Sequence, residues 1–304
     1  MVRSALAPIA LFVYKRPWHT QRVLDGLLTN LEVADSDLYI FSDGAKDSAA
    51  EQAVVSVRTL ARSVEGFRSV TLIEQPTNLG LAQSIISGVN RLTQQYGRVV
   101  VLEDDVVPSP HFLEFMNAAL DRYQDVPEVV SVHGYSYPTR RPLPETFFLR
   151  GADCWGWATW ARGWKIFEPN GAELLARLKA LGQERQFDMD GSYPYTAMLK
   201  DQVAGRNDSW AIRWHASAFL ADCLTLYPGA SQVQNIGTDG SGTHGGATGV
   251  FAHASWGRRV HLGNIPLAES HEALEAFGDF LRRLQPSFSE RVTNRIRKLL
   301  GGGM

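Results

Sequence analysis

The feature that most constrains the fold is an apolar run that ends in three consecutive carboxylates. Residues 99–102 (VVVL) are apolar and mostly β-branched, which is typical of a strand buried on both faces in a parallel sheet. Glu103, Asp104 and Asp105 follow directly. Neighbouring carboxylates repel one another and are costly to bury unless a cation or hydrogen-bond donors compensate them, and a divalent metal ion would do so. A solvated acidic turn beside a core strand is the alternative at this point.

The segment after the acids predicts a helix. Ser109 is suited to be its N-cap, with Pro110 at the first helical position, and apolar residues recur at helical spacing over 112–123. The acids are therefore expected on a turn between a strand and a helix. In open α/β sheets such turns lie at the carboxyl edge of the strands, where ligands bind.

Three earlier segments repeat the pattern of an apolar strand followed by an amphipathic helix. Their strands are residues 6–14 (LAPIALFVY), 37–41 (DLYIF) and 69–74 (SVTLIE). The second of them is followed by another acid, Asp43. Together with the strand at 99–102, four such units in succession predict an α/β fold with a mostly parallel sheet flanked by helices.

The second half of the chain differs in character. Residues 154–164 contain four tryptophans, for which core packing and the wall of a sugar site are both open. The motif Asn-Asp-Ser-Trp at 207–210 is typical of a helix start, with Asp208 or Ser209 as the cap. Residues 235–249 hold six glycines and almost no apolar side chain, which predicts a loop that orders around a ligand.

Length, charge and cysteine usage exclude several classes of protein. A chain of 304 residues suits one large α/β domain or two modest ones. With 30 basic and 32 acidic side chains, nothing favours nucleic acid as a partner. The two cysteines, Cys154 and Cys223, form no disulfide framework or zinc pattern. No signal peptide and no apolar run of about 18 residues is present. These features predict a cytoplasmic protein.

The end of the chain is basic and amphipathic. Residues 287–304 carry Arg291, Arg295, Arg297 and Lys298 against Glu290, with apolar residues between them. Such a segment favours peripheral contact with an anionic membrane, on the inner face in a cytoplasmic protein. A solvated tail remains the alternative.

Several motifs of other enzyme classes are absent from the sequence. It has no P-loop, no glycine fingerprint after the first strand, no G-x-S-x-G and no H-E-x-x-H, which disfavours kinases, dinucleotide oxidoreductases, α/β-hydrolases and zincins. The remaining signal is a set of carboxylate oxygens at a sheet edge, which suits Mg²⁺ or Mn²⁺. Such ions usually hold phosphates, so the expected ligand is a nucleotide diphosphate.

With these motifs in order, the chain resembles glycosyltransferases of the GT-A fold, and most of all the N-acetylglucosaminyltransferase I type. That type carries Glu-Asp-Asp at the end of a hydrophobic strand, as at 103–105. The further matching motifs are Ser42-Asp43-Gly44, Glu74-Gln75-Pro76, Pro110-x-Phe112-x-x-Phe115, Gly156-Trp157, Asp208-Ser209-Trp210 and the glycines of 240–245. The segment Asn78-Leu79-Gly80-Leu81 is instead similar to bacterial inverting enzymes of this fold, so no sugar preference is carried over.

The resemblance implies a role for each donor-side residue. Asp105 would ligate Mn²⁺ or Mg²⁺, while Glu103 and Asp104 would hold the ribose and metal-bound water. Asp43 would accept hydrogen bonds from the base or the ribose. The other donor-binding candidates are Lys15, Arg16 and His244, of which His244 has a structural loop role as its alternative.

The second half of the chain would supply the acceptor site and the base. Trp157 and Trp210 are the candidates for acceptor binding. The resemblance implies that Asp208 is the catalytic base, and the fallback candidates are Asp201, Asp190 and Asp188. A base on the face opposite the leaving diphosphate predicts inversion at the anomeric carbon.

These expectations define three parts of the chain and one function. Residues 1–137 would form the nucleotide-sugar-binding half of a Rossmann-like GT-A domain, 138–265 the acceptor-side half and 266–304 the C-terminal helices. The predicted function is metal-dependent, inverting transfer of a sugar from a nucleotide diphosphate donor, expected to be a UDP-sugar, to a hydroxyl of a glycan or glycolipid acceptor. Synthesis of bacterial surface polysaccharide is the expected setting.

Two other classes remain as alternatives. A sugar-nucleotide nucleotidyltransferase would share the sheet and the acids, but it needs a glycine-rich phosphate loop after the first strand. The chain has Tyr-Lys-Arg-Pro-Trp-His there, at 14–19. A catalytically silent glycan-binding protein would keep the aromatic half without the metal and the base.

Overall fold

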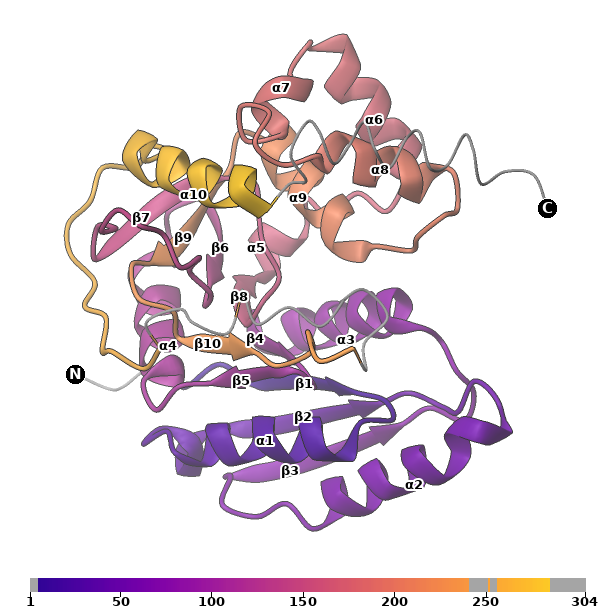
Figure 1. Ribbon diagram of the computed structural model, residues 1–304. Coiled ribbons are helices and arrows are strands. Elements are labelled where there is room, and N and C mark those ends of the chain that lie inside the picture. The colour runs from indigo at the N-terminus through magenta and orange to yellow at the C-terminus, as the bar shows by residue number, and fades with distance from the viewer. Residues whose placement is uncertain (1–4, 241–250, 252–255, 285–304) are drawn as a thin grey trace.

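A mixed sheet of eight strands runs through the protein, with helices on both of its faces (Figure 1). The computed structural model describes residues 5–240, 251 and 256–284. Within these residues the strand order is β3-β2-β1-β4-β8-β6-β9-β7, and six of the eight strands point the same way. The predicted α/β fold with a mostly parallel sheet flanked by helices is confirmed.

The first four strands are all parallel. They are β1 (Ile9–Val13), β2 (Asp37–Ser42), β3 (Ser69–Glu74) and β4 (Arg98–Glu103). Strand β1 lies between β2 and β4, with Leu11 opposite Ile40 on one side and Leu102 on the other. Because the strands are parallel, the acids that follow β2 and β4 lie at the same edge of the sheet, as the sequence predicts.

Helices cover both faces of this parallel half. They are α1 (Pro17–Leu28), α2 (Ser48–Arg62), α3 (Leu81–Tyr96) and α4 (Phe112–Arg122). The apolar sides of α1, α2 and α4 pack into one core cluster, whereas α3 packs into a second cluster with the tryptophans of the other half. The amphipathic patterns of the sequence therefore correspond to two separate layers of core.

The second half of the chain continues the same sheet. Its strands are β6 (Val129–His133), β7 (Thr146–Arg150), β8 (Trp157–Trp160) and β9 (Leu224–Pro228). Strand β8 is antiparallel to both of its neighbours, with Trp157 opposite Val101 of β4 and His133 of β6. The start of β8 therefore lies beside the ends of β4 and β6.

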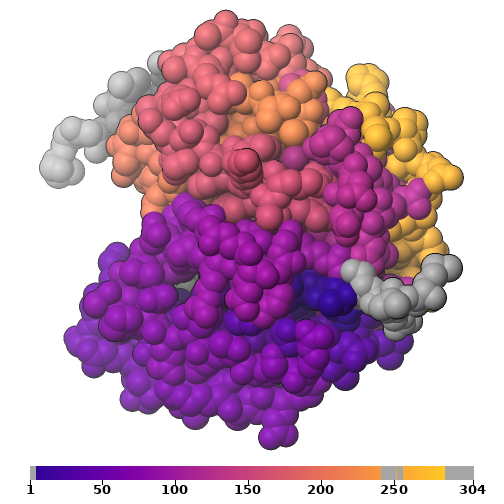
Figure 2. All heavy atoms as spheres, turned by 180° about the vertical axis from the view of Figure 1, so that it is seen from behind, coloured from indigo at the N-terminus to yellow at the C-terminus, as the bar shows by residue number. Residues whose placement is uncertain are grey.

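The helices of the second half form a layer in the upper part of Figure 1, where most of them are drawn in rose and orange and the last one in yellow. They are α5 (Ala161–Trp164), α6 (Gly171–Ala180), α7 (Glu184–Phe187), α8 (Tyr195–Val203), α9 (Trp210–Leu220) and α10 (His271–Leu284). A short 3₁₀ helix, η1 (Val33–Asp35), precedes β2. Seen from behind, this layer adjoins the purple N-terminal part across the width of the molecule (Figure 2).

The chain after the acids differs from the sequence prediction in two ways. A short strand, β5 (Val106–Pro108), follows the turn directly and pairs with β10 (Val233–Asn235). Helix α4 begins only at Phe112, and the predicted cap, Ser109, is not its N-cap. The side chain of Asn30 instead accepts a hydrogen bond from the Leu113 amide at 2.9 Å. A residue 83 positions away thus provides part of the capping, which local sequence does not reveal.

None of the described helices is long and apolar enough to cross a membrane. The basic segment 287–304 lies outside the described residues, and the membrane contact predicted for it stays a prediction.

Candidate functional site

The site is built on the turn between β4 and β5, called here the acidic turn and made of Glu103, Asp104 and Asp105. The turn is fixed from outside, because the amide of Ile236 donates to the carbonyl of Asp105 at 2.8 Å. Gly237 then packs so closely against the Asp105 carboxylate that a β-carbon at this position would clash with it. The start of the glycine-rich segment is therefore seated on the acidic turn.

Arg16 is the cation that the acidic turn contacts. It precedes α1, and its guanidinium lies against both carboxylates of Asp104 and Asp105. Nε is 3.3 Å from Asp104, and Nη2 is 2.9 Å from Asp105. These carboxylates raise the pKa of Arg16 against the opposing effect of its burial. The structure thus brings Arg16 to the acids, and the donor contact predicted for it stays a prediction.

One guanidinium does not balance three carboxylates. Burial, together with the charges of Asp105 and Asp104, raises the pKa of Glu103 to about 8. Burial also raises the pKa of Asp104, although Arg16 opposes the shift. Without a further cation, Glu103 is therefore held mostly protonated near neutral pH, because the turn cannot keep all three carboxylates charged against one guanidinium.

The donor set of the acidic turn fits a hard divalent cation. Carboxylate oxygens are the ligands that Mg²⁺ and Mn²⁺ prefer, and a dication would offset the burial and the repulsion that raise these pKa values. Over residues 5–240, 251 and 256–284, however, no three His, Cys, Asp or Glu side chains are arranged as ligands of one ion. The chemistry of the residues fits the ion, while the oxygens of Asp104 and Asp105 are engaged with Arg16.

Asp43 joins two of the loops at the same edge of the sheet. Its carboxylate accepts hydrogen bonds from the amides of Gly44, Leu79 and Gly80 at 2.8–2.9 Å, and from the side chain of Asn78 at 3.0 Å. Both of its oxygens are thus engaged by the protein. The structure gives Asp43 the task of shaping the loop before α3, and its predicted contact with a nucleotide stays a prediction.

The other donor-side candidates are placed differently. Lys15 is exposed, with its amine 5.5 Å from the centre of the Tyr14 ring. His244 lies outside the described residues. The sequence analysis missed His19, which is buried and holds the carboxylate of Asp239 at 3.0 Å. A histidine three residues after Arg16 in the β1–α1 region was the available signal for it.

Trp157 and Trp210 lie in the core and do not face solvent. They are 0% and 3% exposed, and their rings stack with centroids 5.4 Å apart. Trp164 and Trp214 complete the cluster. Of the two interpretations open for these tryptophans, core packing is the one that fits, because neither ring has an exposed face for a sugar. The cluster joins β8 to α9.

Asp208 is exposed and does not cap α9. The cap is Ser209, whose hydroxyl accepts from the amide of Ile212 at 3.2 Å. The side chain of Asp208 is 76% exposed and lies 3.1 Å from the guanidinium of Arg213. Freedom from capping leaves this carboxylate available for another role.

The fallback candidates for the base have structural partners or lie elsewhere. Asp188 accepts from the amide of Thr196 at 2.6 Å, and Asp201 pairs with Arg206. Asp190 has a positive φ of 54° and borders a cavity of the second half.

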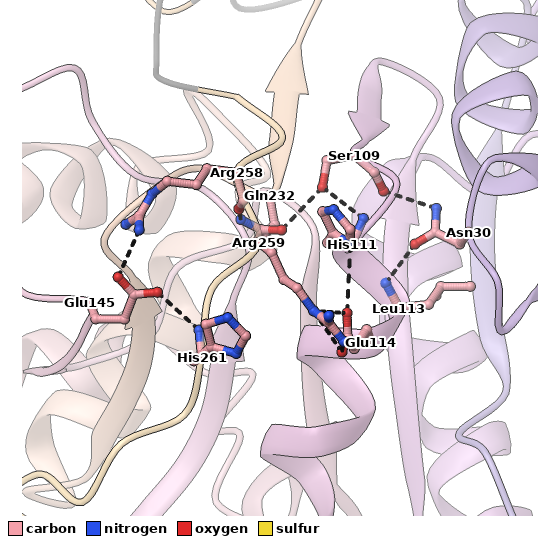
Figure 3. Close-up of polar contacts among 10 residues, drawn as sticks. All are labelled: Asn30, Ser109, His111, Leu113, Glu114, Glu145, Gln232, Arg258, Arg259 and His261. Atoms are coloured by element: carbon pink, nitrogen blue, oxygen red, sulfur yellow. Dashed lines mark hydrogen bonds and ion pairs between the residues drawn. The ribbon is translucent and has the colours of Figure 1, made fainter.

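The chain after the glycine-rich segment is fastened by a polar network (Figure 3). Glu145 binds the guanidinium of Arg258 at 2.9 Å and the amide of His261 at 3.0 Å. Arg259 pairs with Glu114 of α4. Gln232 donates to the carbonyl of Arg258 at 2.9 Å. The described start of the glycine-rich segment, 235–240, is therefore anchored to the acidic turn, and the chain after the segment, 256–261, is anchored to Glu114 of α4 and to Glu145.

Comparisons with known proteins give a limited result. No protein-family model matches this chain, and no curated protein matches it either. Similar solved structures include a mannosyltransferase from Pyrobaculum calidifontis in complex with GDP-Man and Mn²⁺, which is 17% identical with a TM-score of 0.32 over 45% of this chain and 36% of that one.

Another similar structure is TarS of S. aureus, at 12% identity and a TM-score of 0.34, over 57% of this chain and 29% of that one. Its fragment 1–349 matches at 12% identity and a TM-score of 0.34, over 58% of this chain and 49% of the fragment. The chain spans less than half the length of each of these proteins, so its function has to be argued from the site itself.

Proposed function

We propose that this protein is a metal-dependent inverting glycosyltransferase. It transfers a sugar from a nucleotide diphosphate donor, a UDP-sugar, to a hydroxyl of a glycan or glycolipid acceptor, and its setting is bacterial surface polysaccharide synthesis. The observation that carries the proposal is the acidic turn at the carboxyl edge of the parallel strands, where Asp104 and Asp105 lie against the guanidinium of Arg16 and the pKa of the buried Glu103 is raised. The ordered motifs of a GT-A enzyme support it.

In this proposal the acidic turn holds the cation and the donor. Asp105 ligates the ion, since its side chain is 19% exposed whereas that of Asp104 is 8% exposed. When bound, Mg²⁺ or Mn²⁺ would stabilise the negative charge that develops on the diphosphate leaving group. Arg16 lies against the same two carboxylates and is near enough to the turn to bind the diphosphate as well. Asp43 supports the donor indirectly, through the loop that it shapes.

The acceptor hydroxyl requires a base on the face opposite the leaving group. We assign this role to Asp208, whose carboxylate is exposed and precedes a helix of the acceptor-side half. A single in-line displacement inverts the anomeric centre, so an α-linked donor gives a β-linked product. Arg213 holds the carboxylate in place before the acceptor binds.

The test is a panel of nucleotide sugars with Mn²⁺, read by nucleotide release and by the mass and anomeric configuration of the product. The expected result is release of a nucleoside diphosphate and a β-linked product from an α-linked donor. A nucleotidyltransferase, supplied with a nucleoside triphosphate and a sugar phosphate, would join the two and release pyrophosphate. A silent glycan-binding protein would release nothing. Either of these outcomes, or retention of configuration, contradicts the proposal.

A further inference from the structure

A cavity of about 200 Å³ lies in the second half of the molecule, away from the nucleotide-side strands. Its walls come from β7, β9 and the helices α7 to α10, and Figure 1 shows α10 lying beside β7 and β9. The residues that characterise it are Tyr137, Asp153, Tyr195, His215, Tyr227 and Phe277, and we call it the aromatic cavity. Its volume is below the range of about 300–1,000 Å³ for pockets of drug-sized ligands, which suits a single ring.

The aromatic cavity offers flat rings and neutral hydrogen-bonding groups. Burial raises the pKa of Tyr137, Tyr195 and Tyr227 well above the ordinary value, so their hydroxyls stay protonated. Burial also lowers the pKa of His215, whose ring packs on Tyr195 with centroids 4.4 Å apart. Protonated hydroxyls can donate as well as accept hydrogen bonds, as the hydroxyls of a sugar require.

The charged side chains of the cavity are mostly acidic or already paired. Asp153, Asp190 and Glu269 border it. The one arginine in its wall, Arg150, lies 2.9 Å from the carboxylate of Asp222. This balance disfavours a phosphate or another anion and favours an uncharged ligand rich in hydroxyl groups.

Asp153 has an incomplete set of partners. One of its oxygens accepts from the amide of Cys154 at 3.0 Å. The other is 3.9 Å from Nε2 of His133, which is beyond hydrogen-bond distance. Among the residues that the structure describes, neither ring nitrogen of His133 has a hydrogen-bond partner, although this side chain is only 1% exposed. A buried polar side chain without partners, facing a carboxylate across such a gap, indicates that another polar group belongs between them.

The aromatic cavity and the acidic turn are joined by a short stretch of chain. Asp153 is four residues before Trp157, and four residues span at most about 14 Å. Trp157 lies opposite Val101, two residues before Glu103. The charges of Glu103 and Asp105 also contribute to the raised pKa of the Cys154 thiol, after the dominant effect of burial. The cavity and the acidic turn are thus connected through the start of β8.

We propose that the aromatic cavity binds the terminal, uncharged sugar ring of the acceptor, with Asp153 accepting a hydrogen bond from one of its hydroxyls. The identification of this ring as part of the acceptor rests on the proposed function, whereas the binding of a neutral sugar ring can be measured by itself. Asp153 acts as a binding residue, and the base proposed above remains Asp208.

The test is saturation-transfer NMR of the full chain with a panel of methyl hexopyranosides. At least one of them is expected to bind. Asp153→Asn should weaken that binding about 10- to 100-fold, as for a hydrogen bond to a charged group, and Tyr195→Phe about 2- to 10-fold, as for a neutral one. The matched controls are Tyr193→Phe, next to Tyr195 with ring centroids 4.7 Å apart but outside the cavity wall, and Asp201→Asn on α8. Both should bind as the wild type does.

A titration with UDP and Mn²⁺ on the same samples separates the two proposals. Glycoside binding that Asp153→Asn weakens, with unchanged UDP binding, supports the cavity as the acceptor subsite. Glycoside binding without any nucleotide binding would contradict the proposed function and leave a neutral-sugar site. Absence of glycoside binding, or binding that neither Asp153→Asn nor Tyr195→Phe weakens, overturns the cavity proposal. Tyr195→Phe removes a single oxygen, so it keeps the test valid if Asp153→Asn does not fold.

Discussion

The acidic turn and the aromatic cavity adjoin the same sheet, but different kinds of side chain form them. At the turn, three carboxylates gather at consecutive positions after one strand and exceed the charge of their cation, Arg16. In the cavity, rings and neutral hydroxyls come from separate segments of the second half, and the neighbouring His133, which faces Asp153, is buried and has its pKa lowered to about 4 by that burial. The difference teaches that consecutive residues of one turn can gather charge by themselves, whereas the cavity depends on the fold to set a wall of rings and neutral hydroxyls beside its acids.

The largest expected effect concerns Asp208, which belongs to neither of the two regions. Asp208→Asn should lower kcat about 10²- to 10⁴-fold, the usual contribution of a positioned base, with little change in donor affinity. Initial rates over a donor series measure both quantities. Asp201→Asn on the preceding helix removes one of the fallback candidates and should keep full activity if Asp208 is the base. A fully active Asp208→Asn protein would mean that the base lies elsewhere, with Asp153 of the aromatic cavity as the next residue to test.

The pH dependence of stability should differ in sign between the two regions. The folded-state pKa of Glu103, about 8, is above its ordinary value of 4.5, so the folded protein binds more protons than the unfolded chain between these values. Without metal, the stability linked to Glu103 is full below about pH 4.5 and is lost as the pH rises toward 8. Between pH 5 and pH 8 the loss is at most about 4 kcal/mol.

Chemical denaturation in the presence of chelator measures this dependence. Glu103→Gln, which imitates the protonated side chain, should flatten the decline at alkaline pH, and added Mn²⁺ should oppose it in the wild type. An equal decline in Glu103→Gln and wild-type protein would show that the charge of the acidic turn is already balanced.

Removal of Arg16 should unbalance the acidic turn further. Arg16→Gln leaves Asp104 and Asp105 without their cation, and we expect a loss of about 2–3 kcal/mol in the free energy of unfolding, below the usual value for a fully buried pair because the guanidinium is 19% exposed. Mn²⁺ should restore more stability to this variant than to wild type. Arg22→Gln, at an exposed position on α1, is the control. An Arg16→Gln protein as stable as this control would contradict the charge account.

The smallest expected effect belongs to the cavity side. The pKa of His133, about 4, is below its ordinary value of 6.5, so the unfolded chain binds the extra proton between these values. The stability linked to His133 is present above pH 6.5 and is lost as the pH falls toward 4, by at most about 2 kcal/mol between pH 6.5 and pH 5. His133→Gln should reduce the slope of unfolding free energy against pH in this range. An unchanged slope would assign the acid sensitivity to other groups, such as His215.

The parallel half and the acidic turn could be predicted from the sequence because their signals are local. Four apolar runs, each followed by an amphipathic helix, are β1 to β4, and the acids after β2 and β4 lie at the predicted edge. The partners of these acids could not be predicted. Arg16 is 88 residues away from Asp104, and only the β1–β4 pairing brings the two together. Asn30, which accepts a hydrogen bond from the Leu113 amide near the start of α4, is another such long-range partner.

The second half could be predicted only in part, because its site depends on packing. The four tryptophans of residues 154–164 indicated either a core or the wall of a sugar site. One of them, Trp157, stacks on Trp210 of α9, and both rings belong to the core. The cavity wall combines Asp153, Tyr195 and Tyr227, which no motif connects. Asp153, which comes shortly before these tryptophans in the sequence, belongs to no motif, and only the fold places it near His133.

The most direct test of the central claim is sugar transfer with the metal removed and then restored. Initial rates are measured for wild-type protein and Asp105→Asn in chelator and after addition of Mn²⁺ in excess. The account predicts that transfer by the wild type is lost in chelator and recovered with Mn²⁺, while Asp105→Asn stays inactive in both conditions and keeps its fold. Undiminished turnover in chelator, or an Asp105→Asn protein as active as the wild type, would contradict it.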